Sequence, residues 1–392
     1  MKKIQIMLML ALTSALLLIG CQEKEQEQTP ALQPIEETTT APEVSEEVTN
    51  AQPTDTETET PAPDLPPAEG MVRSNITNEW IDEETARTRP IAVMIPNTKT
   101  ASQYGISGAD ILYECNVESS ITRLMGIWED WDNIEKIGNI RSARDYFVYW
   151  AFEWDALLVH YGGPFYMDDL VHRDDTQNID LNVDTSKTYH SRDNAKNEYD
   201  NAFTNTKSLE KYIKDKNYPT GYRQDYSDEQ HFLFASEQSP NTLEEYEDAI
   251  PAGMIDMSLA YPLTNCYFIY NEETGLYERF QHLTGESDGP HIDLANNEQL
   301  TFKNVLIQNT YYEIRDQKGY LAFQCHDTTR DGWFYTNGKG IHVTWEKLAD
   351  YSATRYYDDN GNEIKLNTGK TMICIIEDGD IFTVDGKIID AD

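Results

Sequence analysis

Residues 89–97 have the sequence Arg-Pro-Ile-Ala-Val-Met-Ile-Pro-Asn, a compact apolar strand that ends in a turn. The chain after it repeats this pattern of short apolar runs, broken by aromatic residues at helical spacing. Further strands are expected over 109–117, 121–128 and 156–160, and helices over 144–154 and 208–215. Strands that alternate with helices predict a mixed α/β arrangement for this part of the chain.

From about residue 255 the sequence changes to short runs rich in Tyr, Val and Ile, separated by turn sequences such as Asn337-Gly338. Strands are expected over 265–270, 276–280, 301–308, 321–324, 332–335, 340–345, 353–357 and 371–376. These runs predict a mainly antiparallel β domain. We therefore expect an α+β protein, with a mixed α/β domain over 71–250 that carries the candidate site and a mainly β domain over 251–392.

The first 70 residues predict export and lipid anchoring. Residues 1–20 combine two lysines, a short apolar run and small residues, which are the features of a signal peptide. Cys21 follows directly and resembles the lipobox cysteine of bacterial lipoproteins, whose thiol receives a diacylglyceryl group; the alternative is an uncleaved membrane anchor. Residues 22–70 carry a net charge of −12 and few large apolar side chains, so 21–70 is expected to be a lipidated cysteine followed by an acidic disordered tether. Two acyl chains then hold the protein on the extracytoplasmic face of the membrane.

The charge balance limits the possible partners. Of the total net charge of −38, residues 71–392 carry −28, which excludes nucleic-acid binding by a basic surface and disfavours attraction to anionic lipid headgroups. The four cysteines other than Cys21 have no metal-ligand spacing, so we expect neither a metal site nor a cofactor. Three of the four lie in apolar strand-like runs and are expected to be buried thiols, mostly free, with Cys266 and Cys374 the pair to test for a disulfide.

The densest group of polar residues lies between residues 113 and 163. Strand alternation places Glu114 and Glu118 on one face, and two carboxylates on one face suit acid/base chemistry or a cation site. Arg123, Arg141 and Arg144 are the basic residues expected beside them, either holding one carboxylate ionised or forming a structural salt-bridge network. His160 ends a buried strand before Gly162 and Gly163, where α/β domains often keep their sites, although a core histidine and a simple turn fit the same residues.

These stretches resemble the YerB-like lipoproteins of Gram-positive bacteria over nearly all of residues 85–385. The similarity is carried by 89–97, 109–114, Val117-Glu118, Ile121-Thr122-Arg123, 136–138, Arg141-Ser142-Ala143-Arg144, 159–163, 289–293, 303–308, 343–347 and 366–371. The chain departs from the family pattern at Ser119-Ser120, where glycines are usual, and at Asn139, where proline is usual. The resemblance implies a role in the cell envelope close to the wall-synthesis machinery.

Two functions fit a protein anchored on the extracytoplasmic membrane face, and a third function fits less well. A peptidoglycan-cleaving lytic transglycosylase or related glycosidase would use Glu118 or Glu114 as the acid and act on glycan strands. A non-catalytic adaptor would bind penicillin-binding or division proteins, and a solute- or cation-binding lipoprotein is the third hypothesis. Substrate-binding candidates are Arg123, Arg141, Ser142, Arg144, His160, Gly162 and Gly163, with His291 and Asp293 as candidates in the second domain. Convergence of these residues in one open cleft is the feature that favours the enzyme.

Overall fold

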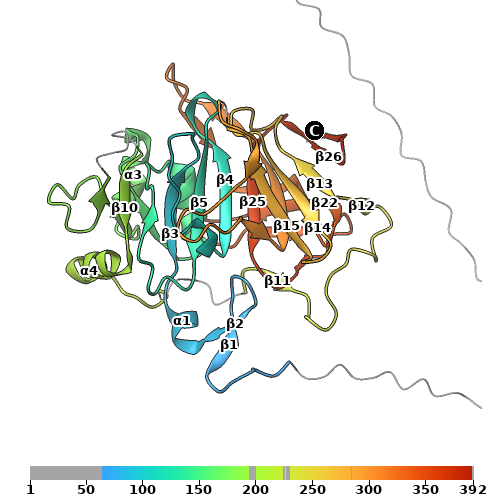
Figure 1. Ribbon diagram of the computed structural model, residues 1–392, viewed down its shortest axis with the longest axis horizontal. Coiled ribbons are helices and arrows are strands. Elements are labelled where there is room, and N and C mark those ends of the chain that lie inside the picture. The colour runs from blue at the N-terminus through green and yellow to red at the C-terminus, as the bar shows by residue number, and fades with distance from the viewer. Residues whose placement is uncertain (1–63, 194–199, 224–225, 227–229, 284, 391–392) are drawn as a thin grey trace, which may run out of the picture. The chain divides into compact units, whose positions relative to one another are not determined.

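The computed structural model describes residues 64–193, 200–223, 226, 230–283 and 285–390. The central element of this part of the chain is an eleven-stranded mixed sheet (Figure 1). Its strands, in spatial order, are β12 (Ile250–Pro251), β22 (Lys339–Lys347), β21 (Asp327–Thr336), β18 (Asn304–Thr310), β25 (Thr371–Glu377), β4 (Ile111–Asn116), β5 (Thr122–Trp128), β3 (Ile91–Pro96), β7 (Leu157–His160) and β8 (Asn178–Asp180), with β23 (Arg355–Tyr357) beside β22. Neighbours are parallel at β18–β25, β25–β4, β3–β7 and β7–β8, and antiparallel elsewhere.

A second, antiparallel sheet is built from the C-terminal part of the chain alone. It contains β16 (Gly289–Pro290), β15 (Leu276–Gln281), β14 (Cys266–Asn271), β13 (Met254–Asp256), β26 (Ile381–Val384) and β27 (Lys387–Asp390), with β17 (Thr301–Phe302) beside β15. The smaller sheets are β1 (Met71–Arg73) with β2 (Trp80–Asp82), β6 (Ile137–Gly138) with β10 (Ala202–Thr204) and β9 (Ser191–Arg192), β11 (Leu233–Phe234) with β24 (Lys365–Leu366), and β19 (Tyr312–Ile314) with β20 (Leu321–Phe323).

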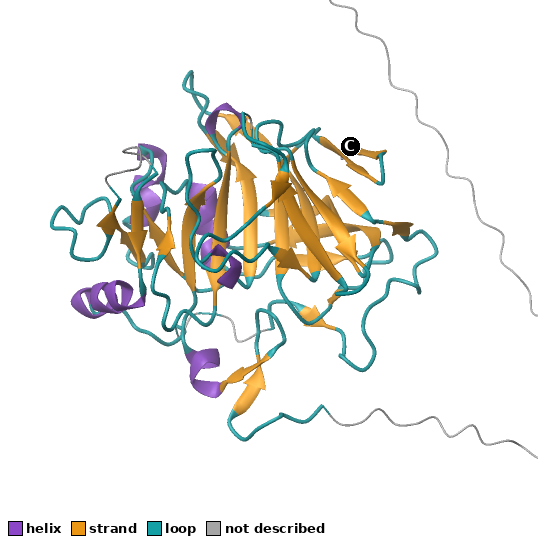
Figure 2. Ribbon diagram, viewed as in Figure 1, coloured by secondary structure: helices purple, strands orange, loops and turns teal. Residues whose placement is uncertain are grey.

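The described part of the chain has few helices, and they lie around the sheets (Figure 2). The α-helices are α1 (Glu83–Arg87), α2 (Asp145–Phe152), α3 (Asp168–Val171) and α4 (Thr206–Lys216), and the 3₁₀ turns are η1 (Ile106–Gly108), η2 (Glu118–Ser120) and η3 (Phe165–Met167). The side chain of Asn205 caps α4 by accepting a hydrogen bond from the backbone N–H of Ser208, which fixes the start of this helix.

The boundary at 250/251 does not separate two sheets. Strand β25 from the C-terminal part pairs in parallel with β4 from the N-terminal part, with Cys374 opposite Glu114 (Figure 1). This pairing joins strands that lie far apart in the sequence, and the local pattern of neither strand predicts which strand it pairs with. The predicted α+β class is confirmed, and the two large sheets are one that both parts of the chain share and one that the C-terminal part builds alone.

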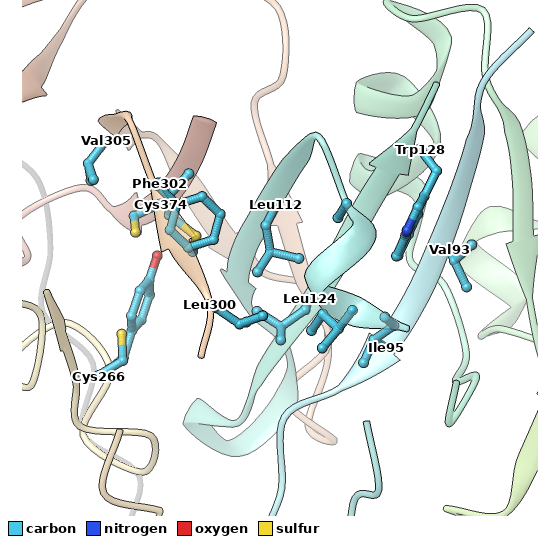
Figure 3. Packing of buried hydrophobic residues seen from close by; sticks show 14 of the residues in the cluster. Val93, Ile95, Leu112, Leu124, Trp128, Cys266, Leu300, Phe302, Val305 and Cys374 are labelled. Carbon is cyan, nitrogen blue, oxygen red and sulfur yellow. The ribbon is translucent and has the colours of Figure 1, made fainter. Parts of the chain in front are cut away.

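Alternation along the central strands divides the core into two layers. On β25, Met372 and Cys374 face the second sheet, whereas Ile373 and Ile375 face the layer that contains α2. Figure 3 shows side chains of the first layer, with Val93 and Leu124 from the N-terminal strands and Phe302 and Cys266 from the C-terminal ones. Each fully buried aliphatic side chain contributes roughly 1.5–3 kcal/mol, so both faces of the shared sheet stabilise the fold. The face covered by the second sheet is the face that carries Glu114.

Most predicted elements are present with small shifts in their ends. The predicted strand over 301–308 is instead two strands, because Lys303 separates β17 in one sheet from β18 in the other. Cys115, Cys266, Cys325 and Cys374 are buried and free, as predicted. The signal peptide, Cys21 and nearly all of the tether lie outside the described residues. No helix in the described part is long and apolar enough to cross a membrane.

Candidate functional site

The edge of the central sheet where β3, β4 and β7 end carries the candidate site. At this edge, η2 follows β4 and places Glu118 against Arg144, just before α2. The guanidinium of Arg144 donates two hydrogen bonds to the carboxylate, from Nε to Oε1 and from Nη2 to Oε2, each 2.6 Å long. Ser119 and Ser120 have φ values of 64° and 57°, a conformation that glycine adopts most easily. The two serines therefore stand where the backbone of this turn favours glycine.

The ion pair keeps Glu118 ionised. Partial burial by itself would raise the pKa of this carboxyl, but the hydrogen bonds and charge of Arg144 outweigh burial and lower the pKa below its usual value. A general acid for glycosidic cleavage needs the opposite, a carboxyl whose pKa is raised so that it holds a proton near neutral pH. Glu118 is therefore positioned as a partner of Arg144 and not as a proton donor.

Arg123 is the unusual member of this group. Its side chain is 5% exposed and forms no ion pair among the described residues, and its Nε has no hydrogen-bond partner there. Nη1 donates to the carbonyl of Ser142 at 2.6 Å. Burial, followed by the charges of Arg144 and Arg141, lowers the pKa of Arg123 to about 9. A buried guanidinium without a counter-ion is costly, and a bound anion removes that cost.

The segment just before α2 holds the arginines in place. The backbone N–H of Arg141 donates to the carbonyl of Met94 at 2.9 Å, and the carbonyl of Arg141 accepts from Tyr161 at 3.0 Å. The segment thus lies between the ends of β3 and β7. The Arg141 side chain pairs with Asp200 at 3.3 Å, and the Ser142 hydroxyl donates to the carbonyl of Tyr161 at 3.0 Å. The peptide bond between Gly138 and Asn139 is cis.

Aromatic side chains border the arginine group. The guanidinium carbon of Arg144 lies 5.7 Å from the ring centre of Tyr320. Tyr320 belongs to the short connection between β19 and β20. Tyr320 meets Tyr166 edge-on at 5.6 Å, and Tyr166 lies 4.0 Å from the ring of Phe165, which is 68% exposed. Arg315 pairs with Asp145 at the start of α2 and holds this connection against the site. Both parts of the chain therefore contribute to the site.

Glu114 does not belong to this site. It is fully buried on the face covered by the second sheet, where its Oε2 pairs with Nη2 of Arg279 at 2.7 Å, and Arg279 is fully buried as well. Asn97 and Thr122 donate to its Oε1 at 2.9 and 2.6 Å. The candidate catalytic role of Glu114 is therefore wrong, because the second sheet seals the face on which Glu114 lies. The predicted common strand face of Glu114 and Glu118 is wrong as well, because β4 ends at Asn116 and Glu118 lies in η2.

His160, Gly162 and Gly163 shape the backbone. Both ring nitrogens of His160 are used, Nδ1 with the carbonyl of Gly162 at 2.9 Å and Nε2 with Oδ1 of Asn178 at 3.1 Å, and the residue is 2% exposed. Gly162 has a φ of 69°, and a Cβ at Gly163 would clash with the sulfur of Met167. These three residues support the turn after β7 and present no free polar group to a substrate.

His291 and Asp293 connect the two parts of the chain. Asp293 is fully buried and accepts hydrogen bonds from the backbone N–H groups of Gly105 and Ser107 at 2.9 and 2.8 Å. His291 contacts Arg279 through Nδ1 and Gln103 through Nε2, and burial lowers its pKa well below the usual value, followed by the charge of Arg279. Their role in this structure is structural, and neither lies in the arginine group.

Sequence reasoning missed Glu129, a carboxyl whose raised pKa suits an acid; Asp380 is another, because burial raises its pKa to about 7. Burial, followed by the charges of Asp110 and Asp130, raises the pKa of Glu129, whereas a hydrogen bond from Ser74 lowers it. Together these effects bring the pKa of Glu129 to about 7. Glu129 lines a groove of about 760 Å³ together with several other carboxylates. The sequence offered one signal for Glu129: it directly follows the apolar strand β5, at the end of the strand opposite Arg123. Among the described residues, no three His, Cys, Asp or Glu side chains are grouped to hold a metal ion.

The raised pKa of Glu129 has a consequence for stability. A carboxyl whose folded-state pKa lies above its unfolded value of about 4.5 binds more protons in the folded protein, so the free energy of unfolding falls as the pH rises from about 4.5 to about 7. We expect Glu129→Gln to reduce this fall by up to about 3 kcal/mol, as measured by urea unfolding at pH 5 and pH 8. Equal pH dependence in the variant and the unchanged protein would show that Glu129 ionises normally.

The fold and the site together define a two-part α+β protein in which a connection from the C-terminal part completes a site at the strand ends of the N-terminal part. Two family models match: the N-terminal domain of DUF3048, described as a protein of unknown function, over residues 76–219, and the C-terminal domain of DUF3048 over 257–373. The chain belongs to this family, that of the YerB-like lipoproteins.

A relative and a solved structure agree with this assignment. The chain is 24% identical over 335 residues to the protein named "Putative lipoprotein YerB" of Bacillus subtilis (strain 168), covering 82% of this chain and 91% of that protein. The crystal structure of the YerB protein from Bacillus subtilis matches with a TM-score of 0.65 and 21% identity, covering 78% of this chain and 96% of that one. The structure supports the fold, and the relative's name supports a membrane-anchored lipoprotein.

Proposed function

We propose that this chain is a lipid-anchored protein of the extracytoplasmic membrane face that binds carboxylate groups of peptidoglycan through Arg123, Arg141 and Arg144, without cleaving the glycan strand. The observation that carries the proposal is the buried guanidinium of Arg123, which has no counter-ion among the described residues. Arginine forms paired hydrogen bonds to carboxylates, and such charge-assisted bonds are about twice as strong as neutral ones. The lactyl and peptide carboxylates of the wall supply the matching anion.

The aromatic border supports a ligand larger than a free ion. Tyr320, Tyr166 and Phe165 extend outward from Arg144, and the exposed ring of Phe165 offers an apolar face of the kind that stacks on sugar rings. The overall charge of −38 repels wall polyanions at long range, so recognition has to rest on short contacts at this site. Such a binding role is compatible with an adaptor that brings penicillin-binding or division proteins to the wall.

Lytic transglycosylation has less support. Of its two predicted acids, Glu114 is sealed in the core and Glu118 is held ionised by Arg144. Glu129, with a pKa of about 7 and a place in a groove, is the group that this second candidate function would need as the acid. Cys21, on which the membrane anchor depends, lies outside the described residues, and the anchor remains part of the proposal.

Incubation of the purified chain with intact sacculi separates the two functions. We expect the protein to sediment with sacculi and to release no anhydro-muropeptides, because Arg144 holds Glu118, the carboxylate that it pairs with, in its ionised form. Glu118→Gln should bind sacculi at least as well, since it frees Arg144 from its internal partner.

Two controls make this result decisive. Sacculi whose carboxyl groups have been amidated should bind the protein much less. Release of anhydro-muropeptides by the unchanged chain, abolished in Glu118→Gln or Glu129→Gln, would contradict the proposal and establish the enzyme.

A further inference from the structure

A small cavity at the far end of α2 has no place in the function proposed above. It has a volume of about 280 Å³ and is lined by His231, Glu346, Tyr351, Tyr357 and Glu153, among others. Glu153 follows α2 directly, whereas Arg144 precedes it, so the helix separates the cavity from the arginine group by roughly 14 Å at 1.5 Å per residue. Ligand pockets usually span about 300–1,000 Å³, and a cavity just below this range suits a single ring.

His231 is the residue that points to a ligand. It is 3% exposed and its ring lies flat against Trp154, with 3.4 Å between ring centres. The backbone of Glu153 lies close enough to interact with one ring nitrogen, and the other nitrogen has no hydrogen-bond partner among the described residues. Burial lowers the pKa of His231 well below its usual value, and the charges of Lys347 and Arg355 lower it further, so the ring is neutral. A buried polar group without a partner costs about 1–3 kcal/mol, which a ligand with matching groups recovers.

The chemistry of the lining selects the class of ligand. A neutral imidazole offers one N–H donor and one acceptor nitrogen, and a hydroxyl group satisfies either. The lining holds the carboxylates of Glu346 and Glu153 and the guanidinium of Arg355, which pairs with Glu363 at 2.9 Å, so its charges are mixed and a neutral ligand fits it. Glu346 already accepts from the Tyr357 hydroxyl at 2.8 Å, which orders it as an acceptor for a further hydroxyl. The carboxylate of Glu153 is not free for a ligand, because Tyr113 donates to its Oε1 and Thr354 to its Oε2, each at 2.6 Å.

We propose that this cavity binds one neutral, hydroxyl-bearing sugar ring, with His231 and Glu346 as its hydrogen-bonding residues and tyrosine side chains as its walls. Tyr351 is fixed against Phe152 by ring stacking at 4.7 Å and donates to the carbonyl of Asp175 at 3.0 Å, so its ring forms a rigid wall. The exposed side chain of Leu348, another lining residue, lies where the chain turns away from β22.

Calorimetric titration of the purified chain with N-acetylglucosamine tests this site. We expect binding in the millimolar range, the usual strength for one small ring with few hydrogen bonds, accompanied by a change in tryptophan fluorescence from Trp154 beneath His231. His231→Phe keeps the stacked ring but removes both nitrogens, and Glu346→Gln is a milder change on a half-buried side chain. Each should weaken binding at least tenfold.

The controls separate this site from the arginine group. Arg123→Met, at the other end of α2, should leave the binding of N-acetylglucosamine unchanged. Absence of heat and of a fluorescence change, or unchanged binding in folded Glu346→Gln, would overturn the proposal. Binding of an alanine dipeptide in place of the sugar, with the same dependence on both variants, would assign the cavity to peptides and also overturn it.

Discussion

Glu114→Gln should lower the free energy of unfolding by about 3–5 kcal/mol, the loss typical of a broken buried ion pair. Arg279 would remain fully buried without the carboxylate that it contacts at 2.7 Å, and His291 beside it is neutral and offers no replacement charge. Urea unfolding at pH 7 measures this change as a lower midpoint at an unchanged slope. Binding to sacculi by the folded variant should be unaltered, because Glu114 faces the second sheet.

The double variant Glu114→Gln/Arg279→Met provides the matched control. Removing the guanidinium together with the carboxylate leaves no isolated charge, so the double variant should be more stable than Glu114→Gln alone. Ordinary surface substitutions change the free energy of unfolding by up to ~0.5 kcal/mol. If Glu114→Gln stayed within this range and lost binding to sacculi, Glu114 would belong to the functional site after all.

Arg123→Met should have the reverse effect, abolishing most ligand binding while leaving stability equal or higher. The side chain is buried with no counter-ion among the described residues, so exchanging it for an apolar side chain of similar length removes a desolvation cost. Loss of a charge-assisted contact of about 1.5–3 kcal/mol predicts a fall in affinity of ten-fold or more. Sedimentation with sacculi and urea unfolding of the same preparation give the two results together.

Arg144→Gln is the contrasting variant for this experiment. It should lose both binding and stability, because it leaves Glu118 half-buried without its partner. If Arg123→Met were strongly destabilised and still bound sacculi normally, Arg123 would be a structural residue, and the binding role of the arginine group would lose its main support.

Local sequence patterns predicted the elements well because each pattern has a local physical cause. Apolar runs gave β3, β4, β5 and β7, and the helix expected over 208–215 lies within α4. The unusual Ser119-Ser120 pair indicated a special turn, which the structure shows as two consecutive residues with positive φ. Arg123, Arg141 and Arg144 were expected near Glu118, and the structure brings all four to one edge of the sheet.

Long-range pairing was beyond the reach of the same reasoning. Whether a carboxylate on a strand faces solvent or a second sheet depends on what packs over it, and Arg279 lies 165 residues from Glu114 along the chain. For the same reason, the pairing of β25 with β4 and the approach of Tyr320 to Arg144 had no local signal. The sequence therefore predicted that the arginines lie near Glu118, but not that Glu114 is sealed in the core, and the binding role of the arginines stays a prediction.

The central claim, that the arginine group recognises a carboxylate, is tested most directly by calorimetric titration with one soluble disaccharide-peptide from peptidoglycan in two forms. One form keeps its carboxyl groups and the other has them converted to amides, so the two ligands share their sugar rings and peptide. The account predicts that the acid form binds at least tenfold more tightly, and that this difference disappears in Arg123→Met. Equal affinity for both forms in the unchanged chain would contradict it.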